Sequence, residues 1–152
     1  MRRVIIVFAC SLLSTPVIGQ DRTDSVPGSG AWSPNRIRWQ VESADGTKWA
    51  VLEGRRDVPG QSFTYAFLIP PGYWEHHWHA SDARVVVVKG ALRLAYGPGL
   101  DSTAAKAYPL GSYVLVPANA QHTMGADVET IIIGTAVGPW ATHRHPSPHH
   151  RP

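Results

Sequence analysis

Short runs of β-branched, aromatic and aliphatic residues alternate with turn residues along most of this chain. Eight of these runs predict strands, and they are Ile37–Val41, Lys48–Glu53, Phe63–Ile69, Arg84–Lys89, Ala91–Tyr96, Ser112–Val116, His122–Gly125 and Thr130–Val137. Turn-forming pairs such as Asp45-Gly46 and Pro59-Gly60 separate them. No stretch longer than about ten residues shows the 3.6-residue hydrophobic period of a helix. Many short strands joined by tight turns predict an all-β sandwich or barrel.

Two of the runs are apolar at every position. Residues 85–88 are all valine, and residues 131–133 are all isoleucine. An uninterrupted apolar run predicts a strand that is buried on both of its faces.

The first nineteen residues have the composition of a targeting segment. Arg2 and Arg3 precede an apolar stretch from Val4 to Val17, and Gly19 is a small residue suited to cleavage. We interpret residues 1–19 as a secretory signal peptide, which implies a periplasmic or secreted protein. The alternatives are a membrane anchor and a lipid-modified Cys10. The apolar stretch is shorter than the roughly 20 residues that span a bilayer, so we expect no membrane span after cleavage.

The remaining chain predicts one domain with two flexible ends. A length of 152 residues and a hydrophobic content of 43% suffice for one core. Residues 20–36 are polar and rich in Gly, Ser and Pro, so we expect a flexible lead-in. The barrel is expected over residues 37–141. Residues 142–152 contain four His and three Pro, and they predict a disordered, exposed tail.

Charge argues against a nucleic-acid partner, and cysteine content argues against a disulfide or a thiolate metal ligand. The formal net charge of the chain is +3, and it falls to +1 when Arg2 and Arg3 leave with the signal peptide. No basic cluster with interleaved aromatic residues is present, so we expect no nucleic-acid partner. The single cysteine, Cys10, also leaves with the signal peptide. The mature chain therefore has no disulfide and no thiolate metal ligand.

A histidine pair is the strongest chemical signal in the sequence. His77 and His79 are two residues apart, so on a strand their side chains point to the same face. His122 follows the strand and turn of residues 112–117 and is placed to project into the same barrel. Three imidazoles can hold one divalent metal ion. The alternative is a barrel whose three histidines are only hydrogen-bonded inside it.

These residues resemble the two motifs of the cupin family. Residues 72–90 are similar to the first motif, which has a Gly, a His-x-His pair, a Glu and a closing Gly. Gly111, Pro117 and His122 are similar to the second motif. The resemblance covers roughly residues 37–140 and identifies the chain as a small single-domain cupin. It implies a double-stranded β-helix (jelly-roll, RmlC-like) barrel with a metal at His77, His79 and His122.

One departure from the family pattern changes the expected chemistry. The motif Glu falls on Ala83, which cannot coordinate a metal. Some cupins, including the thiol dioxygenases, work with three His and no carboxylate. Three neutral imidazoles leave the full +2 charge on a divalent ion, which favours anionic ligands and leaves coordination positions open. The ion is Fe, Zn, Mn, Ni or Cu, and the sequence does not decide between them.

Other polar residues near the motif are candidates for the site, and most have an alternative structural role. Glu75 has the strand parity of His77 and is a substitute carboxylate ligand, or else a solvated loop acid. His76 faces the opposite way and is expected at the surface or behind the ligands. Asp82 either orients a ligand His or sits in a turn. Arg84 either meets an anionic substrate or is an edge-strand charge. Among the aromatic residues, we expect Trp74, Trp78, Tyr65, Phe67 and Tyr113 in the core or around an apolar cavity.

Three functional hypotheses follow from this reading. The first is an exported metal-dependent enzyme, an oxidoreductase of dioxygenase type, that acts on a small and anionic molecule. The second is a non-catalytic cupin module that binds a small ligand or a metal. The third is an assembly role, in which the strand Ile37–Val41 pairs across a homodimer interface.

Overall fold

Eleven strands and one 3-10 turn form the part of the chain that the computed structural model describes, residues 30–99 and 101–144. The turn is Pro34–Arg36, and the strands are β1 (Val41–Glu42), β2 (Lys48–Gly54), β3 (Ser62–Ile69), β4 (Trp74–Trp78), β5 (Ala83–Lys89), β6 (Ala91–Tyr96), β7 (Lys106–Pro109), β8 (Tyr113–Val116), β9 (His122–Gly125), β10 (Thr130–Val137) and β11 (His143–Arg144). The expected signal peptide and residues 145–152 of the expected tail lie outside these residues. No helix in the described ranges is long and apolar enough to cross a membrane.

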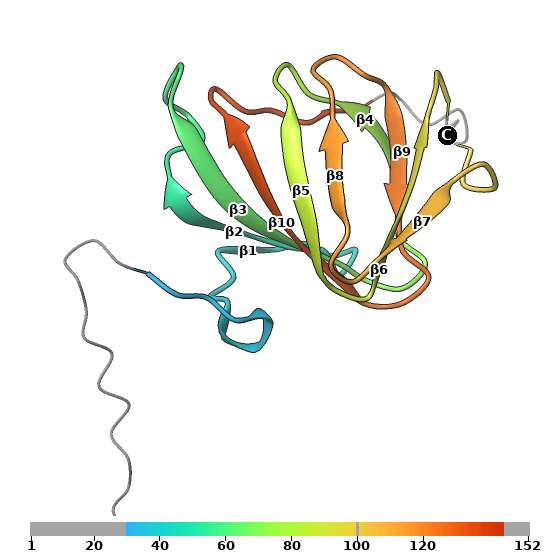
Figure 1. Cartoon of the computed structure of the whole chain (residues 1–152), viewed down its shortest axis with the longest axis horizontal. Coiled ribbons are helices and arrows are strands. Elements are labelled where there is room, and N and C mark those ends of the chain that lie inside the picture. The colour runs from blue at the N-terminus through green and yellow to red at the C-terminus, as the bar shows by residue number, and fades with distance from the viewer. Residues whose placement is uncertain (1–29, 100, 145–152) are drawn as a thin grey trace, which may run out of the picture. The chain divides into compact units, whose positions relative to one another are not determined.

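The strands form two antiparallel sheets (Figure 1). The larger sheet has the order β1-β2-β3-β10-β5-β8, and the smaller has the order β11-β4-β9-β6-β7. Strands far apart in sequence are neighbours, since β10 pairs with both β3 and β5, and β9 pairs with both β4 and β6. The expectation of an all-β barrel is confirmed.

The main hydrophobic core lies on the faces of the strands that point into the barrel. It is built from alternate residues of each strand, such as Val85 and Val87 on β5 and Leu92 and Leu94 on β6. The expectation that β5 is buried on both faces is wrong, because Val86 is 38% exposed on the outer face. On β10, by contrast, Ile131 and Ile132 are both buried.

The expected strand Ile37–Val41 is wrong except for its last residue. A 3-10 turn precedes this segment, and only Val41 belongs to a strand. Ile37 instead packs on the outer face of the larger sheet, in a cluster with buried residues of β2, β3 and β10. The Gln40 side chain bonds both the amide and the carbonyl of Val51, and the Gln40 backbone amide donates to the carbonyl of Trp49 at 3.0 Å. Apolar periodicity alone does not distinguish such a covering segment from a paired strand.

The smaller sheet extends past the expected end of the barrel. His143 pairs with Trp78 and Arg144 with His77, so these first residues of the expected tail form β11 alongside β4. The rings of Trp78 and His143 stack with centroids 4.0 Å apart and an interplanar angle of 13°. This ring contact holds β11 against β4. The His- and Pro-rich composition of the segment gave no sign of a strand.

Candidate metal centre

The structure brings together the three histidines that the sequence singled out. His77 on β4 and His122 on β9 are direct neighbours in the ladder between the two strands. His79 follows the end of β4, where its carbonyl oxygen accepts a hydrogen bond from the Asn119 amide at 2.7 Å. The three side chains are buried, and one nitrogen from each ring lies within 4.8 Å of the other two. Two imidazole nitrogens that bind one ion at about 2.0–2.1 Å lie about 3–4 Å apart. The three rings therefore need to move only slightly closer together to hold one ion.

Backbone carbonyl groups fix the tautomer of two of these rings. Nδ1 of His79 lies 3.1 Å from the carbonyl oxygen of Ala141, and Nδ1 of His122 lies 2.8 Å from that of Ala120. A carbonyl oxygen only accepts hydrogen bonds, so each Nδ1 must carry the proton and donate it. The lone pair of each neutral ring is therefore on Nε2. This is the arrangement in which a histidine binds metal through Nε2.

The third ring has a different partner. Nδ1 of His77 lies 3.3 Å from Oε2 of Glu75, but the contact is not aligned as a hydrogen bond. Glu75 also forms a short ion pair with Arg144 on β11. Glu75 is not part of the cluster of converging ligand atoms. It therefore lies behind a ligand ring, and the alternatives of a metal ligand and of a solvated loop acid are both wrong.

Burial keeps all three imidazoles neutral. Desolvation, followed by the repulsion from His122 and His79, lowers the pKa of His77 from 6.5 to about 2. Desolvation also lowers the pKa of His79 to about 4, although the bond to Ala141 opposes the shift. The pKa of His122 is lowered mainly by desolvation. Neutral imidazole is the form that binds a metal ion.

A small inner cavity of about 30 Å³ adjoins the three histidines. Apolar side chains form most of its remaining wall, and Ala83 is among them. Ala83 is 3% exposed, so its methyl group faces the imidazoles from β5. A water molecule needs roughly 10–15 Å³ of such volume. The cavity therefore fits an ion with one or two small ligands, and no carboxylate from Ala83 competes for it.

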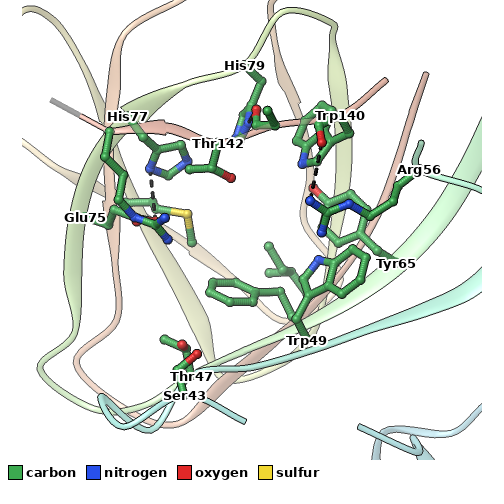
Figure 2. Close-up of a pocket in the computed structure, with 15 residues that line it drawn as sticks. Ser43, Thr47, Trp49, Arg56, Tyr65, Glu75, His77, His79, Trp140 and Thr142 are labelled. Carbon is green, nitrogen blue, oxygen red and sulfur yellow. Dashed lines mark hydrogen bonds and ion pairs between the residues drawn. The ribbon is translucent and has the colours of Figure 1, made fainter. Parts of the chain in front are cut away.

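A larger outer pocket of about 370 Å³ opens beside His77 and His79 (Figure 2). Aromatic residues dominate one side of it, namely Trp49, Tyr65, Phe67 and Trp140. Its charged residues are Arg56, Glu75 and Arg144. Tyr65 and Phe67 line this pocket, as the sequence predicted. The same prediction is wrong for Tyr113, because that residue is 61% exposed on β8.

Tyr65 lies where the inner cavity meets the outer pocket, since it lines both. Its ring crosses Gly134 of β10, where an added Cβ atom would lie 2.2 Å from Cζ of Tyr65. No side chain or backbone group in the described ranges hydrogen-bonds its hydroxyl group. Burial raises the pKa of this hydroxyl group. Tyr65 therefore offers a neutral, unpartnered hydrogen-bond donor beside the histidines.

The residues Arg56, Trp140 and Arg144 were not singled out as site residues by the sequence. Trp140 stacks on His79 with ring centroids 4.0 Å apart. Its amide donates to the carbonyl of Arg56 at 2.8 Å, which ties the end of the barrel to the turn after β2. Arginine and tryptophan are not metal ligands in proteins, so the spacing of possible ligands gave no signal for these three residues.

The remaining candidates have structural roles. Asp82 accepts a hydrogen bond from the Ala118 amide at 2.9 Å and pairs with Arg84 at 3.2 Å. Both side chains are well exposed and line neither cavity. The Nδ1 atom of His76 lies 3.1 Å from the hydroxyl of Thr123, so this ring supports β9 instead of joining the cluster.

Comparison with known sequences places the chain in a family. The sequence profile of the ChrR cupin-like domain matches residues 29–141, which is well over half of the chain. This chain therefore belongs to the ChrR cupin-like domain family. A comparison with curated protein sequences gives no match.

Solved structures show the same fold. The chain is similar to a cupin-like protein from Thermotoga maritima, with a TM-score of 0.57 and 21% identity over 71% of this chain and 86% of that chain. It is also similar to an RmlC-like cupin from Shewanella frigidimarina, with a TM-score of 0.52 and 18% identity over 66% and 84% of the two chains. The polyketide cyclase RemF from Streptomyces resistomycificus gives a TM-score of 0.60 and 13% identity over 80% and 88%. The expected double-stranded β-helix is confirmed, and a three-His cluster in such a barrel suggests a metal-binding site.

The lowered pKa values predict that the metal-free fold loses stability in acid. His77 and His79 titrate near 6.5 when unfolded but near 2 and 4 when folded. Below pH 6.5 the unfolded chain binds more protons than the folded chain. The contribution of the two rings to the free energy of unfolding is therefore complete above pH 6.5 and is lost as the pH falls below that value. Each ring contributes a slope of up to about 1.4 kcal/mol per pH unit.

Urea unfolding of chelator-treated protein at a series of pH values measures this slope. The variant with His77→Gln and His79→Gln serves as the comparison, because it lacks both titrating rings. We expect its stability to change much less with pH. An equal slope in the two proteins would show that the buried imidazoles do not remain neutral.

Proposed function

We propose that this chain is an exported metalloenzyme whose divalent ion is held by His77, His79 and His122. The proposed reaction class is that of a three-His dioxygenase, with a small anionic substrate. The convergence of three neutral imidazoles on a small cavity, two of them with a tautomer fixed by backbone carbonyls, is the observation that carries the proposal. Export is supported by the composition of residues 1–19.

The absence of a carboxylate from the ligand set supports an anionic substrate. The three imidazoles are neutral, so the charge of a divalent ion would remain uncancelled. When bound, such an ion supplies Lewis acidity and open coordination positions for substrate and dioxygen. Imidazole ligands suit Fe, Zn, Cu and Ni, and Mn remains a further option for the identity of the ion.

The residues around the cluster would hold the site in a reactive geometry. The carbonyl groups of Ala120 and Ala141 fix two ligand rings through Nδ1, and the Glu75 carboxylate stands behind the third. Apolar walls around the inner cavity exclude bulk water, which strengthens electrostatic interactions there. The hydroxyl of Tyr65 is available to donate a hydrogen bond to a substrate oxygen at the mouth of this cavity.

A non-catalytic module that captures a small ligand is the second candidate. The replacement of the motif carboxylate by Ala83 favours it, since the resemblance implies a fourth protein ligand at that position. The two candidates share the pocket and differ only in turnover.

The charge argument predicts the effect of restoring the carboxylate. Ala83→Glu places an anion among the three histidines and cancels one unit of metal charge. We expect divalent metal affinity to rise on the order of tenfold and azide affinity for the Co²⁺-loaded protein to fall by a similar factor. Chelator competition measures the first quantity, and titration of the cobalt absorption bands measures the second.

Ala83→Gln is the matched control, because it adds the same bulk without the charge. If Glu and Gln at this position give the same metal and azide affinities, the uncancelled charge has no influence on ligand preference.

Turnover separates the enzyme from the binding module. Small carboxylates, thiols and diols are first screened for thermal stabilisation of the Fe²⁺-loaded chain, which reports binding. Each compound that binds is then tested for oxygen uptake and for an oxidised product by mass spectrometry. We expect uptake with at least one of them, and a fall to the level of free Fe²⁺ in His122→Ala. Ligands that bind without any uptake or product would support the binding module instead.

A further inference from the structure

The outer pocket has aromatic and charged side chains that a metal ion alone would not need. Only His77 and His79 of its lining belong to the cluster. Its volume of about 370 Å³ is within the range of small-molecule sites. Figure 2 shows His77 on one side of this space and Arg56 on the other. The residues between them define what the pocket can hold.

Flat aromatic side chains form a continuous wall between these two ends. Trp49 and Tyr65 are stacked with ring centroids 6.4 Å apart and an interplanar angle of 22°. Tyr65 lies 6.0 Å from Trp140, and Trp140 stacks on His79 at 4.0 Å with an angle of 22°. A planar ligand gains the most from such a surface, because aromatic rings attract one another in stacked or edge arrangements.

Two arginines stand at the mouth of the pocket, and only one of them is neutralised. Arg144 forms an ion pair with Glu75. Arg56 has no carboxylate within ion-pair distance in the described ranges, since the neighbouring Asp57 is paired with Arg55 at 2.8 Å. The charged residues of the lining therefore leave one net positive charge before any metal binds.

The guanidinium of Arg56 is held in place but keeps free donors. Its central carbon lies 4.8 Å from the centroid of the Trp49 ring, a cation–π contact. One terminal nitrogen donates to the carbonyl of Trp140 in a long bond of 3.5 Å. An arginine has five N–H donors in a planar fork, so an edge suited to a carboxylate remains unused.

From this arrangement we propose that the outer pocket binds a flat aromatic carboxylate. The carboxylate pairs with Arg56, the ring lies against Trp49, Tyr65 and Trp140, and the opposite edge faces His77 and His79. The role of this ligand as substrate rests on the proposed function. Its binding does not, because Arg56 and the aromatic wall are complete without a metal.

Three probes test charge and planarity separately by isothermal titration of the metal-free chain. Benzoate is flat and anionic, benzamide is flat and neutral, and cyclohexanecarboxylate is anionic but not flat. We expect benzoate to bind about tenfold more tightly than either of the others, since a charge-assisted pair and ring stacking each add to affinity. Arg56→Gln should weaken benzoate about tenfold and leave benzamide unchanged.

Arg55→Gln is the matched control, since Arg55 is the adjacent arginine and lies outside the pocket lining. Benzoate affinity should be unchanged in this variant. Equal binding of benzoate and benzamide, or equal weakening by both arginine variants, would overturn the carboxylate site. Equal binding of benzoate and cyclohexanecarboxylate would overturn the aromatic wall. These results are independent of metal binding, so they can fail while the proposed function survives, and the reverse.

Discussion

The structure depends on the burial of three uncharged imidazoles around one small cavity. The rings are buried, so a protonated ring would lose its solvation by bulk water, and this keeps the pKa values of His77 and His79 far below 6.5. The protons on Nδ1 of His79 and His122 are used by peptide carbonyls. No group in the described ranges donates a hydrogen bond to the remaining lone pair of either ring. A divalent cation held by the three rings would accept these lone pairs.

The end of the barrel connects this cluster to the outer pocket. Trp140 stacks on His79, the carbonyl of Ala141 orients the same ring, and Arg144 pairs with Glu75 behind His77. Gly138 allows this segment to approach the turn after β2, since an added Cβ would lie 2.5 Å from the carbonyl oxygen of Val58. One short segment therefore positions ligand rings and also shapes the place where a substrate would enter.

The sequence predicted the barrel and the cluster because both depend on local patterns. Two-residue alternation put His77 and His79 on one face, and cupin motif spacing brought in His122. The charged side of the outer pocket was missed because it depends on contacts between distant segments, such as that of Arg56 with Trp140. Glu75 was misjudged for a related reason. Strand parity gave its face, but its partner Arg144 belongs to a strand in a segment whose composition predicted disorder.

Metal content is the most direct test of the central claim. The chain is produced without an affinity tag and analysed by mass spectrometry for bound metals, beside a variant with Gln at positions 77, 79 and 122. A second variant with Gln at positions 145, 149 and 150 controls for metal bound by the tail. The account predicts about one divalent ion per chain in the natural protein and the tail variant, and almost none in the cluster variant. Equal metal content in the natural protein and the cluster variant would contradict it.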